Sequence, residues 1–85
     1  MYQLTPDERM TLLVIELHDP ITKLPISHFG REVLRTHKIE TVEDFVALDR
    51  PALDDIAQAS LYDSARIRAC YQHLNGGKVF ENLHG

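Results

Sequence analysis

The sequence predicts an all-α protein, a compact bundle of about five short helices. Residues that favour helix starts recur along the chain, and apolar residues follow them at helical spacing. No segment alternates apolar and polar residues in the way that a half-buried strand does. With 85 residues, the chain is long enough to bury a single core and is predicted to be one domain.

The clearest helix start is the segment 5–8, Thr-Pro-Asp-Glu. Thr5 is a good N-cap, proline is tolerated in the first turn, and Glu8 occupies the capping-box position. We expect this helix to continue to about His18 and to stop before the Asp19-Pro20 pair. Met10, Leu13, Val14 and Leu17 lie at helical spacing, and Leu12 and Ile15 widen this apolar face. So many apolar residues on one short helix predict packing on two sides, against the core of the domain and against a partner.

Residues 21–26 are expected to form an extended connector that places Leu24 and Ile26 in the core. Ser27 then caps a second helix. The inward residues of this helix are predicted to be Phe29, Val33 and Leu34.

Two short helices follow, and each has a cap of its own. Thr41 begins the first, with Asp44 as the shorter equivalent of a capping-box glutamate. Asp49 begins the second, which accommodates Pro51 in its first turn. The predicted inward residues are Val42, Phe45, Val46, Leu48, Leu53 and Ile56.

A turn at 57–60, with Ser60 as cap, is predicted to lead into a last helix over about residues 61–74. Its buried stripe is Ile67, Cys70, Tyr71 and Leu74, and Arg66, Arg68 and Gln72 are left outside. The run Asn75-Gly76-Gly77 should end this helix. The domain 1–85 thus divides into an N-terminal helix (1–20), a core (24–74) and a C-terminal tail (75–85) that is expected to fold back.

Charge is unevenly distributed along the chain. The formal net charge of −4 argues against strong non-specific binding of nucleic acid. Residues 39–57 are acidic, whereas Lys23, Arg31, Arg35 and Lys38, with His28 and His37 nearby, form a basic strip. This strip keeps a nucleic-acid contact open as an alternative.

The sequence predicts neither a metal site nor a catalytic nucleophile. His18, His28, His37, His73 and His84 lack the spacing of a ligand pair, and the single cysteine, Cys70, lies on a predicted buried stripe. One cysteine forms no intrachain disulfide, and a reduced, cytoplasmic location fits best. No apolar run is long enough for a membrane span. We therefore expect a protein that is not an enzyme and uses no cofactor.

Residues 24–74 carry a pattern of the form L-x-I-S…VLR…K-I-E-T-V-E-D-F-V…L…I…ARI…L, which is most specific over 39–46. This pattern resembles the C-terminal domain of the bacterial RNA polymerase α subunit. The resemblance implies a compact helical domain with a helix-hairpin-helix, and a link to transcription.

The DNA contacts of that family do not carry over to this sequence. An arginine of the family corresponds to Phe29, and its glycine turn followed by lysine and serine corresponds to the segment 60–63, Ser-Leu-Tyr-Asp. Glycine lets backbone amides approach a phosphate closely, and the carboxylate of Asp63 would repel one.

The predicted function is therefore a module that binds another protein, as a transcription-linked regulator. The candidate protein contacts are the apolar first helix together with Glu40, Glu43, Asp44, Asp54, Asp55, Tyr62 and Arg68. The alternative is a DNA-binding helix-hairpin-helix protein that uses Lys23, Arg31, Arg35, Lys38, Ser60 and Arg66. A third reading is a homodimer in which the first helices pair.

Overall fold

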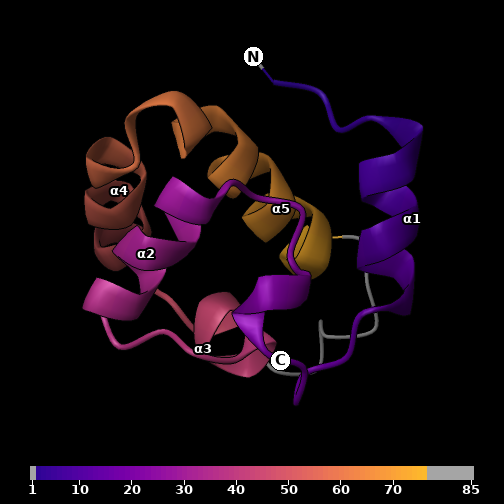
Figure 1. Ribbon diagram of the computed structural model, residues 1–85, viewed down its shortest axis with the longest axis horizontal. Helices are drawn as coiled ribbons and strands as arrows, with labels where there is room; N and C mark the ends of the chain where they lie inside the picture. Colours follow the sequence, from indigo (N-terminus) through magenta and orange to yellow (C-terminus); the bar gives the residue numbers. More distant parts are fainter. Residues whose placement is uncertain (1, 77–85) are drawn as a thin grey trace.

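Five α-helices and two short 3-10 helices form the part of the chain that the computed structural model describes, residues 2–76 (Figure 1). The α-helices are α1 (Pro6–Val14), α2 (His28–Thr36), α3 (Val42–Val46), α4 (Arg50–Ala59) and α5 (Ser64–Gly76). The 3-10 helices are η1 (Ile21–Lys23) and η2 (Leu61–Asp63). Within residues 2–76 there is no strand, only an isolated bridge between Pro20 and Thr41. The prediction of an all-α fold with five helices is confirmed.

Four of the helices begin at the predicted caps. The Thr5 hydroxyl accepts a hydrogen bond from the Glu8 N–H at 3.1 Å, and the Glu8 carboxylate accepts one from the Thr5 N–H at 2.8 Å. Thr41 and Asp44 form the same pair of hydrogen bonds at the start of α3. Ser27 caps α2, and Asp49 caps α4. These bonds satisfy backbone donors that have no partner inside the helix.

The core is assembled around α5, which contacts α1, α3, α4 and η2. Phe45 is fully buried and meets the ring of Tyr71 edge-on, with ring centroids 5.7 Å apart. The Tyr71 hydroxyl donates a hydrogen bond to the carbonyl of Leu48, which ties α5 to the end of α3. The buried apolar cluster consists of Leu12, Ile15, Ile21, Leu24, Ile26, Leu34, Ile39, Val42, Phe45, Val46, Leu53, Ile56, Ile67, Cys70 and Leu74.

The first helix is shorter than predicted, and its apolar residues divide between the core and the surface. It ends at Val14 because Ile15 is extended (φ −76°, ψ 147°). Leu12 is fully buried, whereas Met10, Leu13 and Val14 are 63%, 58% and 74% exposed. The predicted stripe assumed that the helix reaches Leu17, which instead lies beyond its end.

No helix within residues 2–76 is both long and apolar enough to cross a membrane.

The connector and α2 follow the prediction except at Phe29. Leu24 and Ile26 are buried as expected, although the connector contains η1. Phe29 is 50% exposed, so its predicted inward orientation is wrong. The residue that faces the interior at this turn is Gly30, which packs against the side chain of Asp63.

Lys38 adopts a left-handed conformation (φ 64°) at the end of α2. Its N–H donates to the carbonyl of Arg35 at 2.8 Å, and the Ile39 N–H donates to the carbonyl of Leu34 at 2.9 Å. These two bonds, with buried Leu34 and Ile39 side chains, form a Schellman motif in which lysine stands where glycine is usual.

The boundary between the last two α-helices also differs from the prediction. Residues 57–59 belong to α4, and α5 begins at Ser64 after η2. Ser60 does not cap the last helix, because its buried hydroxyl donates to the carbonyl of Ile56 at 2.6 Å. Gly76 is the last residue of α5, and the predicted tail at 77–85 lies outside the described residues.

Candidate interaction surfaces

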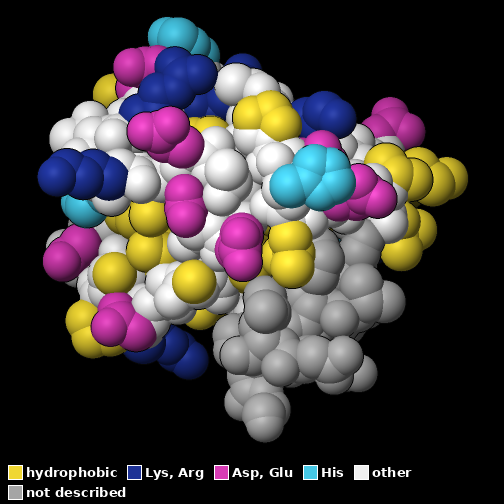
Figure 2. Space-filling view, turned by 90° about the horizontal axis from the view of Figure 1, so that it is seen from below, with side chains coloured by type: hydrophobic (Ala, Val, Ile, Leu, Met, Phe, Trp, Pro, Cys, Tyr) yellow, Lys and Arg dark blue, Asp and Glu magenta, His cyan; other side chains and the backbone are white. Residues whose placement is uncertain are grey.

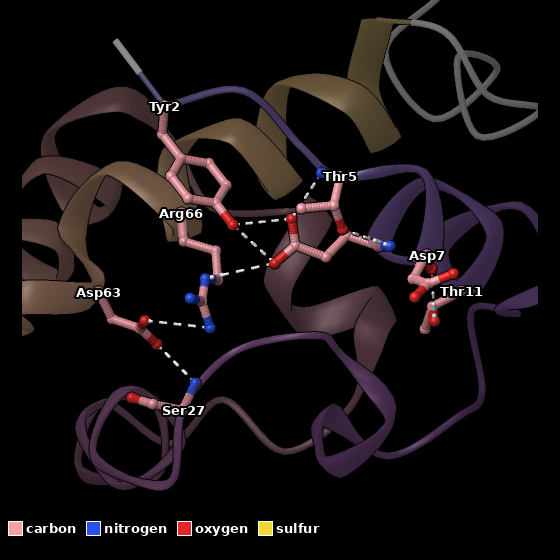
Figure 3. Close-up of polar contacts among 8 residues, drawn as sticks. Tyr2, Thr5, Asp7, Thr11, Ser27, Asp63 and Arg66 are labelled. Carbon is pink, nitrogen blue, oxygen red and sulfur yellow. Dashed lines mark hydrogen bonds and ion pairs between the residues drawn. The ribbon is translucent and has the colours of Figure 1, made fainter.

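A chain of polar contacts joins the N-terminal segment to α5 and α2 (Figure 3). The Tyr2 hydroxyl donates to the Glu8 carboxylate at 2.7 Å, and Arg66 Nε lies 3.5 Å from the same carboxylate. The Arg66 guanidinium also stands over the Tyr2 ring and lies 3.7 Å from Asp63 Oδ1. Asp63 Oδ2 in turn accepts the Ser27 N–H at 2.7 Å. Three segments distant in sequence are therefore held together through one guanidinium and two carboxylates.

The contacts at Glu8 favour its charged form. Burial alone would raise the pKa of Glu8, but hydrogen bonds from the Thr5 N–H and the Tyr2 hydroxyl outweigh burial and leave that pKa below its ordinary value. The same bond to Glu8 raises the pKa of the Tyr2 phenol. Tyr2 and Glu8 thus act as a neutral donor and a charged acceptor, an arrangement that needs no ligand.

The carboxylate of Asp63 fills the space between the first turn of α2 and η2. Asp63 is only 5% exposed, and a Cβ built on Gly30 would lie 2.6 Å from its Oδ2. A negative charge at this position interacts favourably with the N-terminal end of α2. It also disfavours a phosphate at the place where the family resemblance would put one.

The basic strip is partly neutralised by neighbours. Lys23 Nζ lies 3.3 Å from Asp19, and Arg35 Nη1 lies 2.7 Å from Glu32. Arg31 donates to the carbonyl of Thr22, so the structure brings it beside η1. Lys38 is exposed at the end of α2.

The other two predicted nucleic-acid contacts, Ser60 and Arg66, are not accessible to a ligand. Ser60 is fully buried. Arg66 is only about one third exposed and is held among Tyr2, Glu8 and Asp63. The start of the last helix therefore presents neither of these side chains as an open contact.

Two of the five candidate acidic contacts are engaged within the fold, and three are exposed. Asp44 accepts hydrogen bonds from the N–H groups of Glu40 and Thr41, and Asp54 pairs with Arg68 at 2.6 Å. Glu40, Glu43 and Asp55 are exposed. Figure 2 shows carboxylate side chains dispersed among other side chains on this face rather than gathered into one field.

Two further candidate protein contacts, Tyr62 and Arg68, differ in exposure. Tyr62 is fully exposed. Arg68 is engaged by Asp54.

Within residues 2–76, the large apolar side chains that are most exposed lie on α1, on α2 and in η2. Met10, Leu13 and Val14 follow each other at i, i+3 and i+4 on α1, and we call them the α1 ridge. Figure 2 shows hydrophobic side chains at the edge of the molecule where Figure 1 places α1. Phe29 on α2 is 50% exposed, Leu61 in η2 is 64% exposed, and Tyr62 in η2 is fully exposed.

Sequence reasoning placed Phe29 in the core and did not single out Leu61. Leu61 adopts a left-handed conformation, with φ 51°, shortly after α4 ends at Ala59. No signal in the sequence singles it out, because α1 also ends without a glycine and is followed by an extended residue, Ile15.

One histidine does have carboxylate neighbours. His18 Nε2 lies 3.2 Å from Glu16 and 3.9 Å from Asp19. Asp19 already accepts the Glu16 N–H and pairs with Lys23, so its oxygens are engaged in holding the turn after α1. Glu16 and His18 are exposed, and we assign no metal centre to this group.

Cys70 is fully buried, and burial raises the pKa of its thiol to about 12. Because the thiolate is the reactive form, alkylation by iodoacetamide should be about 1,000-fold slower in the folded protein than in urea. Mass spectrometry of timed samples at constant pH measures both rates. Equal rates would show that the thiol is accessible in the native state.

Comparisons with models of known protein families, with curated proteins and with solved structures find no match to this chain.

Proposed function

We propose that this protein is a non-enzymatic interaction module that binds another protein, in the role of a transcription-linked regulator. The observation that supports the proposal most directly is the α1 ridge. Three large apolar side chains at i, i+3 and i+4 are more than half exposed there. This spacing is the one by which an amphipathic helix inserts into an apolar groove of a partner.

The size of the ridge favours a concave partner over a second copy. Each side chain of this kind offers roughly 60–120 Å² of apolar area when fully exposed. Two ridges packed face to face would bury on the order of 300–500 Å², well below the roughly 1,200 Å² of stable interfaces. A groove that wraps around α1 also covers the flanks of the helix, so it adds area that a flat pairing does not.

The link to transcription rests on the resemblance of residues 24–74 to the RNA polymerase α C-terminal domain. The short α3 and α4, joined by the Asp49 cap, support a helix-hairpin-helix of that type. In this proposal the protein shares the helical fold of that domain but lacks its DNA contacts.

DNA binding through the basic strip is less well supported. Lys23 and Arg35 are paired with carboxylates, and the Asp63 carboxylate fills the junction between α2 and η2. Arg31 and Lys38 remain as cations for which the described residues show no ion pair. Two such cations would give only a weak, strongly salt-dependent interaction.

The test is binding of the labelled protein to purified bacterial RNA polymerase, with Val14→Lys as the key variant. Val14 is the most exposed residue of the ridge, so lysine there should preserve the fold and weaken binding by about tenfold or more. Ala47→Lys adds the same charge at another exposed position and should bind like the wild type.

Four outcomes would overturn parts of the proposal. Equal binding of Val14→Lys and the wild type would exclude the ridge as the contact, and a wild type that does not bind polymerase would remove the transcription link. A dimer mass in light scattering that Val14→Lys abolishes would assign the ridge to a second copy. Binding to a DNA duplex that Arg31→Glu abolishes would favour the DNA-binding alternative.

A further inference from the structure

We propose that Arg66 is a two-position switch, which is shared between Glu8 and Asp63 while α1 is docked and passes to Asp63 when α1 detaches. The proposal concerns the protein without a partner, so it does not depend on what binds the α1 ridge. It rests on contact distances, on burial and on which members of the cluster are fixed.

The guanidinium of Arg66 closes on neither of its two carboxylates. The other arginine–carboxylate pairs of residues 2–76, at Arg35 and Arg68, close to 2.7 and 2.6 Å. Arg66 Nε lies 3.5 Å from Glu8 Oε2, and Arg66 Nη1 lies 3.7 Å from Asp63 Oδ1. Both distances exceed the roughly 2.7–3.2 Å of an N–H···O hydrogen bond, and Nε is buried without a hydrogen-bond partner among the described residues.

The two carboxylates are fixed, and the guanidinium is the part that can move. The Glu8 carboxylate accepts the Tyr2 hydroxyl at 2.7 Å and a backbone N–H at 2.8 Å. The Asp63 carboxylate accepts the Ser27 N–H at 2.7 Å, and its side chain is only 6% exposed. In Figure 3 the dashed lines from Arg66 run in opposite directions, to Asp63 and to the carboxylate that Tyr2 also bonds. A rotation of the long arginine side chain that shortens one contact therefore lengthens the other.

Both carboxylates act on Arg66 while α1 is docked. Burial alone would lower the pKa of Arg66, but its contacts with Tyr2, Asp63 and Glu8 outweigh burial and leave that pKa above its ordinary value. The two carboxylates thus compete for one cation, and as like charges they also disfavour each other.

The detachment of α1 ends this competition. Glu8 leaves with α1, because it lies in the first turn of that helix. Asp63 remains, because it belongs to η2 and is bonded to the start of α2. Asp63 and Arg66 are spaced i, i+3, so the guanidinium reaches the remaining carboxylate by a side-chain rotation alone.

The switch lowers the free energy that local opening at α1 requires. The closer pair between Arg66 and Asp63 offsets part of the contact that Arg66 loses at Glu8, and the contact between α2 and η2 persists. Because α1 carries the α1 ridge, the switch would also set how often that surface detaches from the bundle. This last consequence rests on the proposed function.

The test is amide hydrogen exchange of the protein alone, with Glu8→Gln as the key variant. Glutamine keeps the capping-box acceptor and removes the charge. The amides of residues 10–14 should exchange about three- to tenfold faster, whereas the Ser27 amide should exchange at the wild-type rate or more slowly. Asp7→Asn is the matched control, because it removes a charge from an exposed position in the same helical turn. It should change either rate by about twofold at most.

Two further substitutions test the sharing itself. Arg66→Gln removes the cation from both carboxylates, so residues 10–14 and the Ser27 amide should all exchange about threefold faster or more. In an Asp63→Asn background Arg66 has only Glu8 as a partner. Glu8→Gln should therefore accelerate exchange at residues 10–14 about threefold more in that background than in the wild type.

A Ser27 amide that speeds up together with residues 10–14 in Glu8→Gln would overturn the proposal, because Glu8 would then support the contact between α2 and η2. An unchanged Ser27 amide in Arg66→Gln, or an equal effect of Glu8→Gln in both backgrounds, would also overturn it. If Asp63→Asn does not fold, Glu8→Gln and Arg66→Gln decide the question. No partner is used, so failure here and failure of the ridge proposal can be told apart.

Discussion

Replacing Phe45 by alanine is expected to lower the free energy of unfolding by about 3–5 kcal/mol. Phe45 is fully buried, and it packs edge-on against Tyr71, so the substitution removes apolar burial, an aromatic pair and the filling of the core at once. A domain of this size has only about 4–13 kcal/mol of stability in total. Urea denaturation monitored by circular dichroism measures the loss.

Phe29→Ala is the matched control for that experiment, because it makes the same chemical change at a half-exposed position. Its cost should be about 1 kcal/mol, since much of the ring is already in water. If the two variants lose similar stability, the core is not centred on Phe45.

Gly30→Ala is expected to destabilise the protein by about 1–3 kcal/mol, although alanine is normally the better helix residue. A Cβ at this position would lie 2.6 Å from Asp63 Oδ2, and Asp63 is held by the Ser27 N–H and buried. The carboxylate would have to move, and the bond between α2 and η2 would be lost. Thermal and urea unfolding both report the effect.

Gly76→Ala provides the corresponding control in the last turn of α5. Nothing lies within 4 Å of a Cβ built there, so the change should stay within about 0.5 kcal/mol. If Gly30→Ala is as stable as the wild type, Asp63 can move at little cost in free energy, and the contact between α2 and η2 is not rigid.

The helix starts were predictable from sequence because capping is local. Thr5, Ser27, Thr41 and Asp49 each lie within three residues of the backbone group that they satisfy, and each is found in that role. Ser60 looked the same in sequence, but its hydroxyl bonds backward to Ile56. Whether Ser60 caps a helix start or bonds backward depends on where α4 ends, and packing, not the serine, sets that end.

The sequence indicated that the first helix has more apolar residues than the core needs, but not which of them are exposed, because that depends on which face of the helix meets the rest of the fold. In the structure Leu12 faces the core and Met10 is exposed. Phe29 was assigned to the core, but it is half exposed. The buried carboxylate of Asp63 next to Gly30 was not foreseen, since it is a contact between residues far apart in sequence.

The contacts between the N-terminal segment and α5 also bear on the order in which the protein folds. Helices α3, α4 and α5 are consecutive, and their contacts close short loops. Tyr2 and Glu8 reach Arg66 only after nearly the whole described chain has been brought together, which costs more loop entropy. We therefore expect α1 to dock after α3, α4 and α5 have packed, and hydrogen exchange of its amides measures how readily it detaches. A partner that binds the α1 ridge would hold this helix in place.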